Sequence, residues 1–369
     1  MNILHVTKKY PHALGGDAVV VSHLEAEQKK AGHTVTILTS RCDDIIRARH
    51  VYMFGLSDTA EALDSITIRR LLSLVSLFFV SFAFLRRHKP DVIHTHSVDM
   101  AFFVSFAARL YGIPLIHTFH IVTFYNQAQH VIRRKTELWL ARQAHPTSVT
   151  APNNFDVEQL REHGLPQATV LPNGVDISFW RPPSPPQKTD AFTFFSVGRL
   201  EHQKGYPTLL EAVAELKADW PGAFRVLVAG EGSQKTQLAS YAKSHDLEDI
   251  VQFVGRKSPD EIRTLLHNSQ AAIFPSLYET TPLTLLEAWA AGLPVIMTPV
   301  GILRGASINF DAAFVTPIED ATQLAKTMRH CLEDETHRRQ VAVSGQQEAT
   351  KYAWPAIAEQ AEQLYRGAL

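Results

Sequence analysis

The sequence holds only two cysteines, Cys42 and Cys331, among its 369 residues. Two cysteines cannot form a disulfide framework or a cysteine-based metal site, so they indicate a reducing compartment. An excess of either charge is also missing, because 36 Lys and Arg residues stand against 37 Asp and Glu residues. This balance argues against a strongly basic nucleic-acid-binding protein. The first residues lack the basic region and long apolar core of a secretory signal, so we expect a cytoplasmic protein.

The sequence also lacks the low apolar content that is typical of disordered chains. Hydrophobic residues make up 45% of the sequence and charged residues 20%, which are ordinary values for a folded globular protein. The chain is roughly two to three times as long as a common single domain. We therefore expect two domains.

One apolar run without charges, residues 71–85, lies between the pairs Arg69-Arg70 and Arg86-Arg87. As a helix it would reach about 22 Å, which is short of the roughly 30 Å hydrocarbon core of a bilayer. We expect a buried helix, with peripheral contact at the inner face of a membrane as the alternative. A true membrane span is disfavoured.

Apolar strands and helices alternate along the first half of the chain. Gly15-Gly16 forms a turn after the first strand, Asp17 is suited to cap the next helix, and Gly32 ends it. Such alternation predicts right-handed crossovers and a parallel, doubly wound sheet. The expected strands are Asn2–Thr7, 35–39, 91–94 and Leu115–Thr118, and the expected helices are 18–31, 71–85 and 100–110.

Residues 171–186 interrupt this alternation. They contain five prolines and the pair Asn173-Gly174, which cannot continue a helix or a central strand, so we interpret them as an interdomain linker. Two Rossmann-like domains with a ligand in the cleft between them are the simplest account of the α/β pattern. After the linker, the expected strands are Phe192–Val197, Phe224–Ala229, 250–254, Ala271–Phe274 and 294–298, and the expected helices are 207–217, 234–245, 260–268 and about 282–291.

Two glycine-containing turns can bind an anion. Gly15-Gly16 opens a helix, where free N–H groups and the positive helix end suit a negative charge, although the G-x-G-x-x-G fingerprint is absent. Arg199 and Lys204 follow a strand end that Gly198 opens. Two cations at one strand edge can converge on a polyanion. The alternatives are a plain tight turn and a solvated loop.

Glu279 and Glu287 stand eight residues apart around the start of a predicted helix. Thr281 is suited to cap this helix with Pro282 at its first position. Glu287 then lies within a mostly apolar helix, where a carboxylate is costly unless it has a partner. Ribose hydroxyls are such a partner, because a carboxylate accepts two hydrogen bonds at once. The alternative is an acid near the helix cap and a second one on the surface.

His120 follows the fourth predicted strand of the first domain, where we expect it to face the cleft. The alternatives are an interior histidine with satisfied hydrogen bonds and a surface histidine. His94, His96 and His117 crowd the same sheet edge, which raises the question of a metal site. The set has no evident carboxylate partner, so we expect no metal there.

Together these residues resemble a known family, the retaining nucleotide-sugar glycosyltransferases of family 4, which have the GT-B fold. The resemblance covers nearly the whole chain. Its most specific element is the pair Glu279 and Glu287, spaced as E-x7-E, with E-A-x-A-x-G-x-P-V beginning at the second glutamate. The other motifs are P-x-x-x-G-G (Pro11, Gly15, Gly16), K-P-D-V-I-H-T-H (89–96), L-P-N-G-V-D (171–176), V-G-R-L with K-G (197–205), G-E-G (230–232), Tyr352-x-Trp354 and Leu364-Tyr365.

The resemblance implies two Rossmann-like, doubly wound parallel-sheet domains that face each other across a cleft. Residues 1–178 would form the acceptor-side domain and residues 179–354 the domain that binds the nucleotide sugar. A C-terminal helix of about residues 355–369 would pack back on the first domain.

The resemblance also implies a role for each candidate residue. Four would be catalytic: His120 contacts the transferred sugar, Arg199 and Lys204 neutralise the donor diphosphate, and Glu279 holds hydroxyls of the donor sugar. The donor-binding positions would be Gly15, Gly16, Gly198, Gly230, Arg256, Thr280, Thr281, Pro282, Leu283 and Glu287, the last of these on the ribose. No metal or other cofactor would be required, because the two cations and helix N-termini stabilise the leaving nucleoside diphosphate.

The implied co-substrates are a nucleoside diphosphate sugar, UDP or GDP, and a hydroxyl acceptor on a glycan, a lipid or a small molecule. The sequence departs from the family pattern in residues 279–282, where E-G-F-G is usual, and at Ile121 and Pro152. A GT-B epimerase or phosphorylase and a non-enzymatic sugar-binding protein remain as alternatives.

Overall fold

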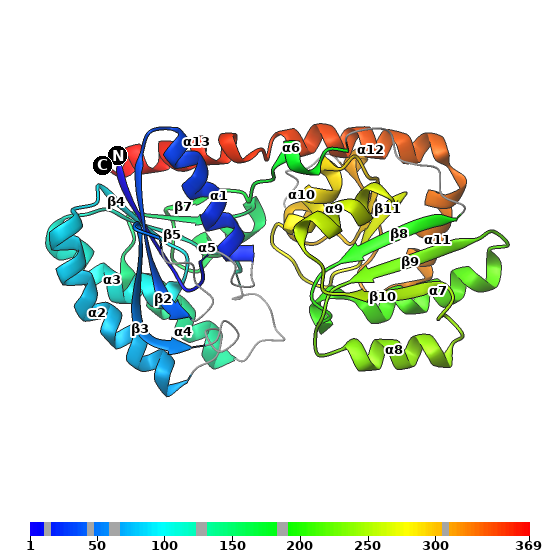
Figure 1. Cartoon of the computed structure of the whole chain (residues 1–369), viewed down its shortest axis with the longest axis horizontal. Helices are drawn as coiled ribbons and strands as arrows, with labels where there is room; N and C mark the ends of the chain where they lie inside the picture. Colours follow the sequence, from blue (N-terminus) through cyan, green and yellow to red (C-terminus); the bar gives the residue numbers. More distant parts are fainter. Residues whose placement is uncertain (11–15, 43–47, 59–66, 123–130, 183–190, 305–309) are drawn as a thin grey trace. The chain divides into compact units, whose positions relative to one another are not determined.

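The computed structural model describes residues 1–10, 16–42, 48–58, 67–122, 131–182, 191–304 and 310–369. They form two compact units, one of Met1–Asn173 with Trp354–Leu369 and the other of Gly174–Ala353. Each unit is a parallel sheet with helices on both faces (Figure 1). The sequence prediction placed the domain boundary after residue 178, whereas the structure places it between Asn173 and Gly174.

Seven parallel strands form the sheet of the first unit, in the order β3-β2-β1-β4-β5-β6-β7. The order reverses between β1 and β4, which is the switch point of a doubly wound sheet. We did not predict β3, β6 and β7; β3 contains Gly55, which interrupts its apolar pattern. The strands are β1 (Asn2–Thr7), β2 (Thr34–Cys42), β3 (Val51–Asp58), β4 (Val92–Thr95), β5 (Leu115–Thr118), β6 (Ser148–Ala151) and β7 (Ala168–Val170).

Helices cover both faces of this sheet because successive strand side chains point to opposite sides. Leu4 and Leu38 pack with α2 and α3, and α4 lies beside α3. Val35 and Ile37 pack on the other face with α1, beside which lies the C-terminal helix α13. The helices are α1 (Gly16–Lys30), α2 (Ile68–His88), α3 (Val98–Tyr111), α4 (Val131–Ala144), α5 (Asn154–Glu162) and α13 (Trp354–Ala368).

The predicted buried helix of residues 71–85 is longer in the structure and buried on one side only. In α2, Leu74 and Leu77 face the core, whereas Leu71 and Phe79 are exposed. Within the described part of the chain, α2 alone is long and apolar enough to cross a membrane by length and composition. Because its inner side packs on the sheet and on α3, it is a helix of the folded unit.

Six parallel strands form the sheet of the second unit, in the order β10-β9-β8-β11-β12-β13. This order reverses between β8 and β11. All but the short β13 were predicted, with ends that differ by at most a residue or so. The strands are β8 (Phe192–Val197), β9 (Phe224–Ala229), β10 (Val251–Gly255), β11 (Ala271–Phe274), β12 (Val295–Met297) and β13 (Phe314–Val315).

Two apolar clusters fill the two sides of this sheet. α7, α8 and α11 supply one cluster, and α6, α9, α10 and α12 border the other, in which Trp289 is fully buried. The helix α6 lies inside the predicted linker, and Trp180 at its end packs into the second unit, so this part of the linker belongs to a domain. The helices are α6 (Ile177–Trp180), α7 (Tyr206–Asp219), α8 (Lys235–Ser244), α9 (Pro259–His267), α10 (Leu283–Ala290), α11 (Ala321–Glu333) and α12 (Glu335–Thr350).

Candidate active site

The carboxyl ends of β8 and β11 hold a charged pair. These strands are neighbours where the strand order reverses, and ligands of such sheets bind outside the carboxyl ends of the strands at that point. Lys204 follows β8 at the end of the short helix η2 (His202–Lys204), and Glu279 follows β11. The Lys204 ammonium donates to the Glu279 carboxylate, and the two side chains are only 16% and 13% exposed. The Ser276 hydroxyl lies 3.3 Å from the same carboxylate oxygen and donates to it.

The two loops that carry this pair are held together by their backbones. The Leu277 N–H donates to the Gln203 carbonyl at 2.8 Å. Gly205 has φ +66°, and a Cβ atom there would lie 2.0 Å from the Pro275 carbonyl oxygen. Only glycine fits this close approach. The position of the charged pair is therefore fixed by main-chain contacts between the loops.

A second close approach joins the loops after β8 and β9. The Gly198 N–H donates to the Ala229 carbonyl at 3.0 Å, and the Gly230 N–H donates to the Gly255 carbonyl at 2.8 Å. Gly230 has φ +146°, and a Cβ atom on it would lie 1.9 Å from the Gly198 carbonyl oxygen. The structure thus brings together Gly198 and Gly230, two of the predicted donor-binding residues.

Two further predicted residues lie at this sheet edge with exposed side chains, Arg199 after β8 and Arg256 after β10. Beside Arg199, Glu201 accepts hydrogen bonds from the Ser233 N–H at 2.9 Å and hydroxyl at 2.6 Å. These bonds, with the nearby Arg199, hold the pKa of Glu201 below its ordinary value. Both guanidinium groups are accessible to an anion from solvent.

The prediction that Thr281 caps the helix of Glu287 is wrong. The helix α10 begins at Leu283 and its N-cap residue is Pro282, which offers no side-chain acceptor to the first N–H groups. Proline before the helix fixes φ, and its ring leaves these N–H groups without a side-chain cap. Thr280 and Thr281 are buried before the helix start. The backbone N–H groups at this helix start are suited to a negatively charged ligand group.

Glu287 lies one turn further along α10, between Leu286 and Ala288. Burial raises the pKa of its carboxyl group to about 7. Among the residues that the structure describes, none provides a hydrogen bond or ion pair to this carboxylate. The Glu287 side chain is partly buried. A carboxylate in such surroundings with no partner among the described residues is costly, and hydroxyl donors from a ligand would compensate.

In the first unit, His120 is the outer end of a chain of histidines. His120 Nε2 lies 3.0 Å from His96 Nδ1, and His96 Nε2 lies 2.9 Å from His5 Nδ1. His5 Nε2 is 2.8 Å from the Gln28 side-chain oxygen. Burial lowers the pKa of His5, His96 and His120 below the ordinary value, so all three are neutral near pH 7.

The side-chain amide of Gln28 determines which ring nitrogen of each of these three histidines carries the proton. Its nitrogen donates to the Tyr365 hydroxyl at 3.2 Å, so its oxygen accepts from His5 Nε2. A neutral imidazole has one donor and one acceptor nitrogen. His5 Nδ1 therefore accepts from His96, and His96 Nδ1 accepts from His120. His120 Nδ1 is then the unprotonated nitrogen, which can accept a hydrogen bond from a hydroxyl.

The crowded histidines form a different set from the one we expected. His5, which sequence reasoning missed, groups with His94 and His96 closely enough to hold an ion, whereas His117 hydrogen-bonds to the Thr95 carbonyl at 3.1 Å. Every ring nitrogen of the three grouped histidines already has a hydrogen-bond partner. The group therefore fits a neutral network better than a cation site. The doubly wound strand order, which pairs β1 with β4, was the signal that could have placed His5 there.

The predicted site residues thus divide between the two units. Gly16, at the exposed start of α1, and His120 belong to the first unit. Gly15 and Pro11 lie outside the described residues. The cleft between the domains and the contacts across it stay predictions. The remaining predicted residues, which are Gly198, Arg199, Lys204, Gly230, Arg256, Glu279, Thr280, Thr281, Pro282, Leu283 and Glu287, belong to the second unit.

Known proteins resemble both units. Residues 14–179 match the family model described as Glycosyltransferase Family 4, and residues 178–348 match the model described as Glycosyl transferases group 1. The glycogen synthase of Mycobacterium tuberculosis is 30% identical over 400 aligned positions, which cover 100% of this chain and 95% of the relative. The chain belongs to glycosyltransferase family 4.

Solved structures show the fold of this glycosyltransferase to be GT-B. Sucrose-phosphate synthase from Thermosynechococcus elongatus superposes with a TM-score of 0.83 at 22% identity, covering 100% of this chain and 99% of the other. HepE from Anabaena, solved in complex with UDP-glucose, superposes with a TM-score of 0.76 at 17% identity, covering 99% of each chain. In this glycosyltransferase, the pair Lys204 and Glu279 lies in the part that matches the group 1 model. His120 lies in the part that matches the family 4 model.

Proposed function

We propose that this glycosyltransferase moves a sugar from a nucleoside diphosphate sugar to a hydroxyl acceptor, with retention of anomeric configuration. The observation that carries the proposal is the Lys204–Glu279 pair at the switch point of the second sheet. It places a cation for the diphosphate beside a carboxylate for the sugar hydroxyls. The complex of the similar HepE with UDP-glucose supports a UDP-sugar, and a GDP-sugar is the other donor we expect.

Each side chain of the second unit then has a task that its surroundings favour. Lys204 turns from Glu279 to the diphosphate and stabilises the charge that develops when the bond to the sugar breaks. Arg199 and the first N–H groups of α10 bind the same phosphates. Glu279 accepts hydrogen bonds from hydroxyls of the transferred sugar. Glu287, whose carboxylate has no partner among the described residues, accepts hydrogen bonds from the two ribose hydroxyls.

His120 acts from the first unit. The hydrogen bonds through His96, His5 and Gln28 leave its Nδ1 unprotonated. This nitrogen accepts a hydrogen bond from a hydroxyl of the transferred sugar. Because the leaving diphosphate is neutralised by side chains and helix N–H groups, we propose that the reaction needs no divalent metal. We place the reaction in the cytoplasm, where nucleotide sugars meet an acceptor that is a glycan, a lipid-linked glycan or a small molecule.

Release of the nucleoside diphosphate tests this proposal. Thermal-shift screening of UDP-, GDP-, ADP- and TDP-sugars identifies the donor, because a ligand of the native state raises the melting temperature. A panel of hydroxyl acceptors is then added to the enzyme and this donor in excess EDTA. We expect nucleoside diphosphate and a glycosylated product in equal amounts. Conversion of the donor without an acceptor, or a strict requirement for a divalent ion, would contradict the proposal.

A further inference from the structure

The outer side of α2 and α3 carries large apolar side chains that the protein leaves exposed. Phe79 and Leu110 are 68% and 66% exposed, and Leu71, Leu72, Val75 and Phe106 are each between 37% and 58% exposed. We call these six residues the α2–α3 surface. Single exposed apolar side chains are common, but a contiguous group on two packed helices marks an interaction surface.

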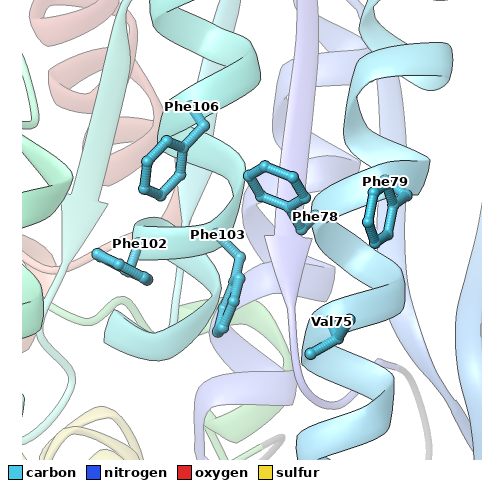
Figure 2. Close-up of a pocket in the computed structure, with 6 residues that line it drawn as sticks. All are labelled: Val75, Phe78, Phe79, Phe102, Phe103 and Phe106. Carbon is cyan, nitrogen blue, oxygen red and sulfur yellow. The ribbon is translucent and has the colours of Figure 1, made fainter.

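A cavity opens between the two helices on this surface (Figure 2). Its volume is about 370 Å³ and all of its lining side chains are apolar. The Phe78 ring contacts the Phe106 ring edge-on, with 5.4 Å between the ring centres. A polar ligand would find no hydrogen-bond partner here, whereas an alkyl chain would lose only its contact with water. The lining residues are Val75, Phe78, Phe79, Phe102, Phe103 and Phe106.

Positive charge borders this apolar surface at several points. Arg69 precedes it at the start of α2, and Arg86 and Arg87 follow it at the end; all three side chains are exposed. Arg109 lies 5.1 Å from the centre of the Phe106 ring. The sequence of α2 contains no Asp or Glu. The surface thus combines an apolar face with a rim of arginines, which suits the boundary between acyl chains and anionic headgroups.

Arg70 does not belong to this rim, although the sequence grouped it with Arg69. Its side chain is 5% exposed and bonds to Asp99 at 2.8 Å and to the Ser40 hydroxyl at 2.9 Å. Its charge is neutralised inside the protein. The arginine fixes the start of α2 to α3, which holds the exposed face of the helix in place.

We propose that the α2–α3 surface docks this protein on an anionic lipid bilayer, with α2 lying in the plane of the membrane and an acyl chain entering the phenylalanine cavity. A span is incompatible with the fold, because Leu74, Leu77 and Leu85 of α2 are buried against the first unit. The rim of arginines also argues against a second copy of the chain. In a two-fold interface the same surface of both copies meets, so two rims of arginines would face each other.

Co-sedimentation with vesicles tests the docking. One set of vesicles is phosphatidylcholine alone, and the other is phosphatidylcholine mixed with phosphatidylglycerol. We expect the protein to bind the mixed vesicles and to lose binding as salt is raised, because salt screens the arginines. Equal binding to both sets, or none to either, would overturn the proposal.

Two variants separate the apolar and the charged contributions. Leu72→Ser/Phe79→Ser removes exposed side chains only, and we expect binding to mixed vesicles to fall at least roughly tenfold. Arg69→Gln/Arg86→Gln/Arg87→Gln is expected to lower it by roughly tenfold or more and to remove the salt dependence. The matched controls are Val343→Ser and Arg339→Gln, which are exposed on α12 of the second unit. Wild-type binding by both variants, or a loss of equal size in the controls, would show that this surface does not bind the membrane.

Trp139 reports where the bilayer lies. It is 54% exposed on α4, and its ring centre is 5.7 Å from that of Phe102, which lines the cavity. Lipids brominated on the acyl chain should quench its fluorescence, and Trp139→Phe should lose this quenching. If Leu72→Ser/Phe79→Ser instead abolished a dimer seen by analytical ultracentrifugation while wild type ignored vesicles, the occupant would be a second copy. None of these readouts needs a donor, so they stand or fall separately from the glycosyl-transfer assay.

Discussion

At the switch point of the first sheet, β1 and β4 carry His5 and His94 side by side, and burial keeps both imidazoles neutral near pH 7. At the switch point of the second sheet, the loops after β8 and β11 carry Lys204 and Glu279 as an ion pair. The six strands of the second sheet follow the same order as the first six strands of the first sheet, which has β7 in addition. The first unit has a network of neutral histidines here, which ends at His120, and the second has a pair of opposite charges. Under the proposed function, one fold used twice in a chain would divide sugar contact and phosphate binding between its copies.

The largest expected effect comes from removing the cation of the charged edge. Lys204→Ala should lower kcat/KM roughly 30- to 1000-fold, because leaving-group charge develops beside this lysine. This loss corresponds to about 2–4 kcal/mol of transition-state stabilisation. The matched control is Lys257→Ala, which removes a surface ion pair with Glu261 in the same unit. A loss of less than tenfold in Lys204→Ala would show that this edge does not neutralise the diphosphate.

The two carboxylates of the second unit should differ in phenotype. Glu287→Ala should raise the donor KM by roughly tenfold and weaken binding of free nucleoside diphosphate, because the ribose is bound equally in ground and transition states. Glu279→Ala should lower kcat by a similar factor and leave nucleotide affinity unchanged, since its contact is with the transferred sugar. Calorimetry of both variants with the product nucleotide, beside steady-state kinetics, decides the assignment. The reverse pattern would exchange the two roles.

The charged edge should also respond to pH through Glu287. Burial raises its pKa to about 7, so the carboxylate is mostly ionised above pH 7 and protonated below it. Only the ionised form accepts both ribose hydroxyls. The donor KM should therefore rise as pH falls, by up to about tenfold from one unit above this pKa to one unit below it. In Glu287→Gln the donor KM should be high and flat over the same range. A parallel rise in the variant would assign the titration to another group.

The neutral edge should lose stability in acid. Burial lowers the pKa of His117 from 6.5 to about 3. Between these two pH values the imidazole is protonated in the unfolded chain and neutral in the folded one. Stability from this residue is complete above pH 6.5 and is lost as pH falls from 6.5 towards 3, at about 1 kcal/mol per pH unit. Urea unfolding at pH 7 and pH 5 should show a smaller loss for His117→Gln than for wild type. The exposed His245→Gln is the control and should behave as wild type; an unchanged loss in His117→Gln would contradict the assignment.

The strands of the second unit, apart from β13, could be predicted from the sequence, because each is a mostly apolar run with glycine or proline close to one end. The failures have local causes. β3 is interrupted by Gly55, and the start of α10 was misplaced because Pro282 fits either the N-cap or the first helical position. α2 was expected to be buried because a run without charges gives no sign of which side faces the core.

The site was predictable residue by residue but its contacts were not. Motif order indicated that Lys204 and Glu279 belong to one site, yet 75 positions separate them, and only the pairing of β8 with β11 shows that they touch. The histidine chain was missed for the same reason. Gln28 carries no motif, and the motif at Tyr365 does not indicate a histidine partner; both residues reach the histidines through the packing of α1 against α13.

The ion pair between Lys204 and Glu279 has a consequence for small anions. An unpaired lysine in a basic pocket retains inorganic phosphate, which is abundant in cells and would compete with the donor. Here a phosphate ion must first separate the pair, and it then faces a carboxylate to which it offers repulsion and few donors. A nucleotide sugar bound as we propose would satisfy both partners, with its diphosphate on the lysine and its hydroxyls on the glutamate. Under the proposed function, the two side chains that bind the substrate would therefore also disfavour binding of other anions by the resting enzyme.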